Sequence, residues 1–102
     1  MFVAQSTSGR NGVEIEKLSF IIIPADRVND FIDADTAIWE PWLMQQRGYI
    51  RKTATIYPDG RVDLRVYWAS KRDLEKAAKS PEIPVLDVRL RSSFLGVYNR
   101  LP

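Results

Sequence analysis

Residues 35–70, DTAIWEPWLMQQRGYIRKTATIYPDGRVDLRVYWAS, decide the fold of this chain. They open with the end of an amphipathic helix, whose apolar residues are spaced three and four apart, and continue through Gly48 into two strands of alternating character. Pro58-Asp59-Gly60 joins the strands and supplies a fixed φ, a turn-forming carboxylate and a residue that tolerates positive φ. The stretch therefore predicts a helix followed by a β-hairpin.

The segment before this stretch predicts a strand and the start of the helix. Residues 13–23 alternate at first, with Glu14 and Glu16 in the polar positions, and then become continuously apolar. That change predicts a strand that is covered on both faces at its end. Asp26 is the expected N-terminal cap of the helix, and Gly48 is its expected stop.

The segment after it predicts a second helix and leaves one element open. Ser70 followed by Asp73 resembles a capping box and predicts a helix that Pro81 stops. Residues 86–91 alternate like a strand, but they also fit a short helix before a last strand around residues 94–99. With either interpretation the order is strand, helix, strand, strand, helix, strand. This predicts an α+β, ferredoxin-like (βαββαβ) fold, with an antiparallel sheet and both helices on one face.

The length of 102 residues predicts one domain, over residues 13–102, behind a flexible tail over residues 1–12. A chain this short buries a small core, so pairing with a second copy would add stability. The longest apolar run, residues 20–23, is far too short to span a membrane, and the tail lacks the pattern of a signal peptide. We therefore expect a cytoplasmic protein with no membrane partner.

The chain contains no His and no Cys. Their absence excludes disulfides, thiolate nucleophiles, cysteine–zinc sites and histidine-based acid–base chemistry. No phosphate-binding loop or metal-ligand spacing occurs in the sequence either. We expect no cofactor and no metal.

The net charge of +2 is unevenly distributed between the two halves of the chain. Residues 1–46 hold three basic and seven acidic residues, whereas residues 47–102 hold twelve basic and six acidic ones. A basic half suggests an RNA-binding module, and Arg47-Gly48-Tyr49 opens like the aromatic strand motif of such modules. The motif then fails, because Ile50 and Arg51 stand where a small residue and an aromatic one should follow. We expect no nucleic-acid partner, and the two halves instead complement each other within or between subunits.

A longer pattern links the helix, the hairpin and the second cap. It reads Phe31-x3-Asp35-x2-Ile38-Trp39-x-Pro41-x-Leu43, then Gln46-x-Gly48-Tyr49-x2-Lys52, then Trp68-Ala69-Ser70. Over residues 13–78 the chain thereby resembles a family of small uncharacterised cyanobacterial proteins. That family is similar to the dimeric α+β barrel superfamily, which includes antibiotic biosynthesis monooxygenases and haem-degrading monooxygenases.

The resemblance implies a homodimer whose two sheets form a barrel with the helices outside. It also implies a pocket between helices and sheet in each subunit. Haem degradation in this superfamily needs an axial histidine, so the lack of histidine argues against that activity. The polar, aromatic second face of the hairpin fits a hydrogen-bonded interface between subunits, although such side chains also suit an exposed sheet.

Five residues are candidates for a ligand pocket: Asp35, Trp39, Trp42, Trp68 and Arg65. Asp35 lies near the centre of the apolar stripe of its helix, where an ionised carboxylate needs a cation or several donors. Arg51, Arg65 or a tyrosine hydroxyl are the expected partners. The three tryptophans would line a flat aromatic pocket, and by resemblance Trp68 has the strongest case. A structural ion pair and core tryptophans are the alternative interpretation of the same residues.

These observations leave the function unassigned and catalysis undecided. The favoured interpretation is a homodimer that binds a small, flat aromatic ligand. The alternative is a cofactor-free monooxygenase acting on an activated aromatic substrate, since that chemistry asks only for orientation and a modest proton acceptor.

Overall fold

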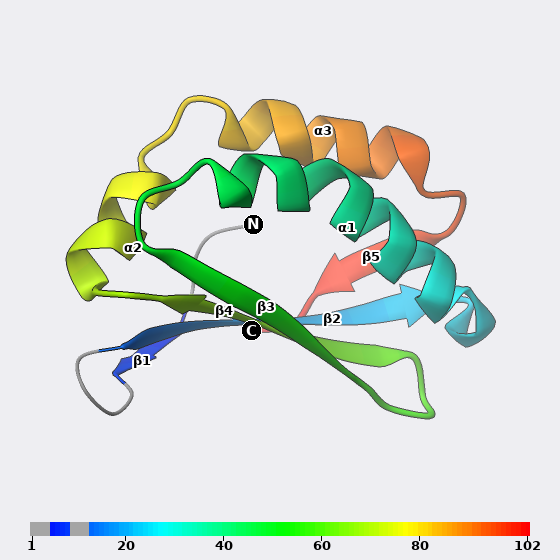
Figure 1. Ribbon diagram of the computed structural model, residues 1–102. Coiled ribbons are helices and arrows are strands. Elements are labelled where there is room, and N and C mark those ends of the chain that lie inside the picture. Colours follow the sequence, from blue (N-terminus) through cyan, green and yellow to red (C-terminus); the bar gives the residue numbers. More distant parts are fainter. Residues whose placement is uncertain (1–4, 9–12) are drawn as a thin grey trace.

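In the computed structural model, which describes residues 5–8 and 13–102, two long helices cover one face of an antiparallel sheet (Figure 1). The elements in chain order are β1 (Gln5–Ser8), β2 (Glu14–Ile23), a 3-10 turn (Ala25–Arg27), α1 (Val28–Met44), β3 (Tyr49–Ile56), β4 (Arg61–Trp68), α2 (Lys71–Ala78), α3 (Ile83–Ser93) and β5 (Val97–Arg100). Helices α1 and α3 lie beside each other over the sheet, and the shorter α2 lies at one end of it.

The strand order confirms the predicted ferredoxin-like α+β fold. The sheet runs β3-β4-β2, and every neighbouring pair is antiparallel. β1 and β5 share the remaining edge of β2, β1 along its first half and β5 along its second half. β1 falls inside the range predicted as a flexible tail, whereas residues 1–4 and 9–12 of that range lie outside the described residues.

Helix α1 forms where its apolar spacing predicts, because the stripe that includes Phe31, Trp39 and Leu43 packs against the sheet with those three side chains fully buried. The predicted cap was one residue early: Asp26 belongs to the 3-10 turn, and Arg27 precedes the first α-helical residue. Pro41 is exposed inside the helix, which runs on to Met44.

The two predicted turn signals are confirmed. Gly60 has a φ of +93° in the hairpin between β3 and β4, and Gly48 has a φ of +85° in the turn after α1. At Gly48 a Cβ would also lie 2.2 Å from the Asp73 carboxylate, so the turn packs against the start of α2. Ser70 caps that helix by accepting a hydrogen bond from the Asp73 amide at 3.1 Å.

Residues 86–91, for which the sequence left both a strand and a helix open, form part of helix α3. Leu86, Leu90 and Phe94 recur every four residues and are buried beneath α3, while Val85 and Val88 face solvent. The strand interpretation of residues 86–91 was therefore wrong. The apolar residues of this segment alternate as in a strand, but some are also four apart, as on one side of a helix. Packing against α1 selects the helix.

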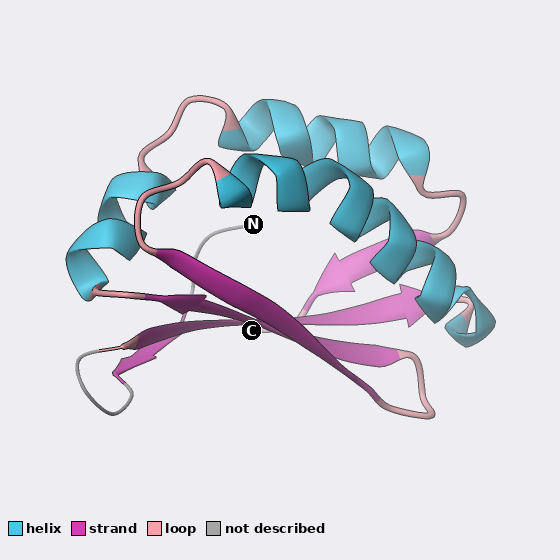
Figure 2. Cartoon of the chain, viewed as in Figure 1, coloured by secondary structure: helices cyan, strands magenta, loops and turns pink. Residues whose placement is uncertain are grey.

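The other face of the sheet carries no helix among the described elements (Figure 2). Asp63 on β4 is nevertheless 1% exposed there, because neighbouring side chains cover it. Ser19 and Arg61 donate hydrogen bonds to its carboxylate at 2.7 and 3.0 Å, and Lys17 lies 3.9 Å away. Burial pushes the pKa of Asp63 upward, but these donors outweigh burial and hold the pKa below its usual value.

Candidate functional site

An acidic stripe lies on the buried face of β2. Glu14 and Glu16 are 3% and 1% exposed and share the helix-covered face with Leu18, Phe20 and Ile22. Glu14 and Glu16, the polar positions of the predicted alternation, therefore lie on the buried face of the strand. Their spacing already carried the signal, because residues two apart share a face and the apolar series from Leu18 has the same parity.

The same register overturns the expectation that β2 is covered on both faces at its end. Ile21, on the other face, is only half-buried, and Ile23 is 50% exposed. The continuous apolar run therefore reflects one buried face and one partly open face of this single chain.

Asp35 lies on the sheet-facing side of α1 and is 1% exposed, as its place in the apolar stripe of the helix predicts. Lys52 on β3 donates a hydrogen bond to its Oδ2, and both side chains are nearly buried. Its Oδ1 has no hydrogen-bond partner within the described residues. Burial raises the pKa of Asp35 above its ordinary value, and the Lys52 ammonium opposes that rise.

The partner of Asp35 differs from the expected ones. Lys52 pairs with Val66 in the hairpin and so shares the helix-covered face, whereas Arg51 pairs with Tyr67 on the open face. Arg65 is also on the open face, where it donates a hydrogen bond to the Thr55 hydroxyl at 3.3 Å. The structure thus separates Arg65 from the other four predicted pocket residues.

Trp68 connects β4 to the acidic stripe. Its Nε1 donates a hydrogen bond to Glu16 Oε1 at 3.4 Å, and both side chains are fully buried. Burial raises the pKa of Glu16 to about 7, although the Trp68 donor and the charges of Arg100 and Lys52 pull the pKa down. Glu16 Oε2 has no hydrogen-bond partner within the described residues. A carboxyl group with this pKa exchanges protons near neutral pH.

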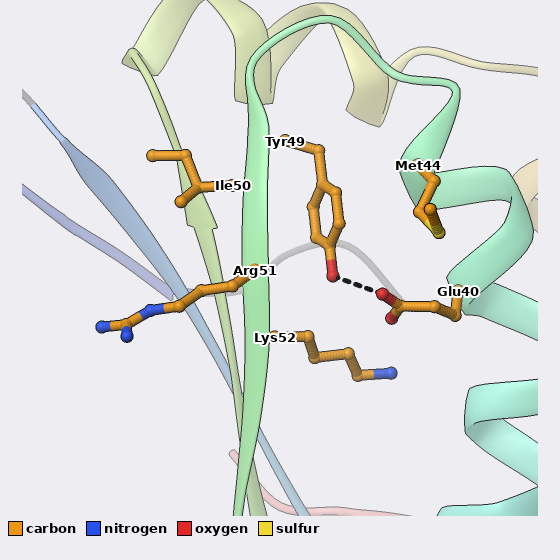
Figure 3. A pocket seen from close by; sticks show the side chains of 6 residues that line it. All are labelled: Glu40, Met44, Tyr49, Ile50, Arg51 and Lys52. Atoms are coloured by element: carbon orange, nitrogen blue, oxygen red, sulfur yellow. Dashed lines mark hydrogen bonds between the residues drawn. The ribbon is translucent and has the colours of Figure 1, made fainter.

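Lys52 also faces a hollow of about 430 Å³ between α1 and β3 (Figure 3). Across it the Tyr49 hydroxyl donates a hydrogen bond to Glu40 Oε1 at 2.9 Å. Figure 3 shows Tyr49 and Lys52 pointing toward the helix and Arg51 pointing away from it. A bulge between Tyr49 and Arg51 explains this, because it shifts the alternation so that Tyr49 and Lys52 share a face.

The other two predicted tryptophans, Trp39 and Trp42, lie in the core on the same helix as Asp35. Trp39 is one helical turn after Asp35 and is fully buried, and Trp42 meets it edge to face at 5.7 Å between ring centroids. Trp39 also borders a second, smaller hollow, which is lined by residues of β2, α1, α3 and β5. Asp35, Trp39 and Trp68 are all buried between the helices and the sheet, and of these three residues Trp39 borders a hollow, whereas Asp35 and Trp68 line neither of the two hollows.

The described part of the chain contains no group of three or more His, Cys, Asp or Glu side chains arranged to hold a metal ion. Within the same residues, every helix is too short or too polar to cross a membrane. The cluster of Glu16, Asp35 and Lys52 offers two acceptors and one ammonium donor, which suits hydrogen bonding and proton transfer.

The fold is shared with several solved structures. A monooxygenase from the ActVA-Orf6 gene of Streptomyces coelicolor, solved with nanaomycin D, has a TM-score of 0.67 and 17% identity, covering 88% of this chain and 83% of its own. SnoaB, a cofactor-independent oxygenase from Streptomyces nogalater, has a TM-score of 0.56 and 14% identity over 88% and 90%. A conserved protein from Methanosarcina mazei has a TM-score of 0.56 and 13% identity over 87% and 89%.

This likeness is one of fold. Sequence identities of 13% to 17% establish a shared fold, but they do not establish a shared ligand or reaction. No protein-family model matches the sequence, and no curated protein matches it. The predicted relationship to antibiotic biosynthesis monooxygenases is thus supported at the level of the fold, and the narrower resemblance to a cyanobacterial family stays a prediction.

Proposed function

We propose that this chain is a homodimeric protein that binds a small, flat aromatic molecule between its helix layer and its sheet. The observation that carries the proposal is the pair of buried carboxyl groups, Glu16 and Asp35, each with one oxygen lacking a partner among the described residues. Acidic groups in a core are costly unless hydrogen bonds or charges compensate them. A ligand with a hydroxyl donor would supply the missing bond, and Trp39 and Trp68 would flank its ring.

Binding of α-naphthol offers a direct test. We expect saturable quenching of tryptophan emission in the parent protein and about tenfold weaker binding in Glu16→Gln, because the amide is a weaker acceptor than a carboxylate. The matched control is Glu75→Gln on the exposed side of α2, which should bind as the parent does. Quenching that never saturates, or that is equal in all three proteins, would contradict a site at Glu16.

A second candidate is a cofactor-free monooxygenase, and the pKa of Glu16 near 7 favours it. As general base, Glu16 would take the hydroxyl proton, and the electron-rich anion would then reduce dioxygen at the para carbon. One naphthol and one O₂ give one para-naphthoquinone and one water, so atoms and electrons balance without a further reductant. Oxygen uptake separates the two candidates: the binding protein consumes none, whereas the enzyme consumes one O₂ per naphthol and slows about a hundredfold in Glu16→Gln.

The dimer is proposed to form through the helix-free face of the sheet. That face presents paired charges and stacked aromatics, including the Arg51 guanidinium 4.3 Å from the centre of the Tyr67 ring. Polar but internally satisfied surfaces of this kind fit an interface between copies of one chain. A cytoplasmic location and the lack of a nucleic-acid partner stay predictions.

Light scattering should therefore give twice the 11.7 kDa mass of the chain. We expect Ile21→Glu, on the helix-free face, to halve that mass, because it places an unpaired carboxylate in the interface. Val88→Glu, on the exposed side of α3, is the matched control and should leave the dimer intact. A parent protein that stays at 11.7 kDa at every concentration would remove the barrel dimer from the proposal.

A further inference from the structure

The larger hollow, of about 430 Å³ between α1 and β3, has an amine in its wall. Lys52 lines it from β3, and 8% of this side chain is exposed. Figure 3 shows Lys52 and Tyr49 directed toward the helix, whereas Arg51 is directed away from it. The Tyr49 hydroxyl is bonded to Glu40 Oε1 at 2.9 Å. Lys52 Nζ is therefore the candidate nucleophile of this wall.

The amine of Lys52 is bonded to a carboxyl group behind it. Lys52 donates a hydrogen bond to Asp35 Oδ2, and Asp35 is 1% exposed and does not itself line the hollow. Burial makes both charges of the pair costly, and transfer of one proton from Lys52 Nζ to Asp35 removes both of them. The raised pKa of Asp35 favours the protonated carboxyl group that this transfer produces. The pair thus holds its own acceptor for the proton that makes an ammonium unreactive.

The charges of this pair select the class of molecule that suits the hollow. An anionic ligand at Lys52 would add a second negative charge beside Asp35, with one ammonium to compensate both. A neutral carbonyl compound avoids that cost. Met44, Ile50 and the Tyr49 ring, which line the same hollow, offer apolar and aromatic contacts to the rest of such a molecule.

We propose that Lys52 forms an imine with an aldehyde bound in this hollow, and that Asp35 takes up and returns the proton. This goes beyond the proposed function, because the site lies at the hollow between α1 and β3 and uses neither Glu16 nor a tryptophan. A protonated imine carries the same positive charge as the ammonium that it replaces. The buried Asp35 carboxylate therefore remains compensated after the reaction.

The reaction balances without an oxidant or a reductant. Lys52 Nζ gives one proton to Asp35, and its lone pair attacks the carbonyl carbon. A second proton moves from the nitrogen to the former carbonyl oxygen, which gives a neutral carbinolamine. The nitrogen lone pair then expels the hydroxyl group, which leaves as water with the proton that Asp35 held. One ammonium and one aldehyde thus give one protonated imine and one water.

Labelling of the full chain by benzaldehyde at pH 7 tests the proposal. Sodium cyanoborohydride converts the imine into a stable benzylamine, and peptide mapping by mass spectrometry identifies the labelled lysine. An exposed lysine at this pH has on the order of one amine in a few thousand unprotonated. We expect Lys52 to gain a benzyl group at least tenfold faster than Lys71 and Lys76, which are exposed on α2. Equal rates at the three lysines, or labelling of Lys71 and Lys76 without Lys52, would overturn the proposal.

Variants separate the roles of the amine and the carboxyl group. Lys52→Arg keeps a cation beside Asp35 but cannot form the imine, so the fast label should disappear. Asp35→Asn frees the amine from its counter-charge but cannot supply the proton that leaves with the hydroxyl group, so labelling of Lys52 should slow about tenfold. Lys71→Arg is the matched control and should leave the rate at Lys52 unchanged. Labelling of Lys52 in Asp35→Asn that is as fast as in the parent would overturn the role of Asp35. Since peptide mapping of the parent alone locates the label, a variant that fails to fold leaves the main test intact.

Discussion

Replacing Lys52 by methionine is expected to lower the free energy of unfolding by about 3 kcal/mol at pH 8, because it leaves the Asp35 carboxylate buried without its cation. The side chains of Lys52 and Asp35 are only 8% and 2% exposed, so solvent cannot replace the lost partner. Urea denaturation measures the loss. It should be smaller at pH 5, since Asp35 can then take up a proton and become neutral.

The double variant Lys52→Met with Asp35→Leu is the control for this interpretation. Removing both members of a buried pair leaves no uncompensated charge, so its stability should return to that of the parent or exceed it. Met44→Ala, an exposed change at the end of α1, should have a much smaller effect. If Lys52→Met is as stable as the parent at pH 8, Asp35 is not held by that ion pair.

The second large effect is the loss of stability that Glu16 causes as the pH rises. Its pKa is about 7 in the folded chain, against an ordinary value of 4.5, so between those pH values the folded state holds a proton that the unfolded state has released. Stability that is fully present below pH 4.5 is therefore lost as the pH rises to about 7 and beyond. The shift corresponds to about 3 kcal/mol.

Urea denaturation at a series of pH values between 5 and 8 tests this. Asp63 does not obscure the result, because its lowered pKa makes its own contribution disappear only at more acid pH. The pKa of Asp35 is also raised, so Asp35 likewise lowers stability as the pH rises, and a smaller slope remains when Glu16 is replaced. Glu16→Gln should flatten most of the decline and be more stable than the parent at pH 8, whereas Glu75→Gln should keep the parent slope. If the stability of Glu16→Gln declines with pH as steeply as that of the parent, the group that holds the proton is not Glu16.

Taken together, these two effects describe a core that gives up stability to retain charged groups. Natural proteins keep such groups mainly where they serve binding or catalysis. If Glu16→Gln gains stability at pH 8 and also loses affinity for α-naphthol, the cost of Glu16 is linked to its role in the proposed site. If it gains stability and binds as before, the proposed role of Glu16 is excluded.

The hairpin, α1 and the cap of α2 were predictable because their signals are local. Pro58-Asp59-Gly60 fixes a turn through the backbone preferences of three neighbouring residues, and Ser70 caps its helix through a bond to an amide three residues away. Asp35 was predictable for a similar reason, since the position of a residue on a helical stripe depends only on its spacing from its neighbours.

The contents of the site required tertiary structure. The shared face of Glu16 and Leu18 follows from their spacing, but the hydrogen bond between Glu16 and Trp68 depends on the pairing of β2 with β4. The choice of Lys52 over Arg51 depends on one bulge in β3, which no spacing rule reveals. Likewise, α3 became recognisable only once it packed against α1.

The sequence by itself thus determined the central order of strand, helix, hairpin and helix, the ferredoxin-like architecture and the burial of Asp35, since each follows from interactions between residues close in the chain. Only the tertiary structure decided that Lys52 pairs with Asp35, that Trp68 pairs with Glu16, and that Arg91 and Arg100 border a common hollow. These groups come from different strands and helices. Their meeting depends on strand register and on how the helices pack, which are set by long-range contacts across the whole core.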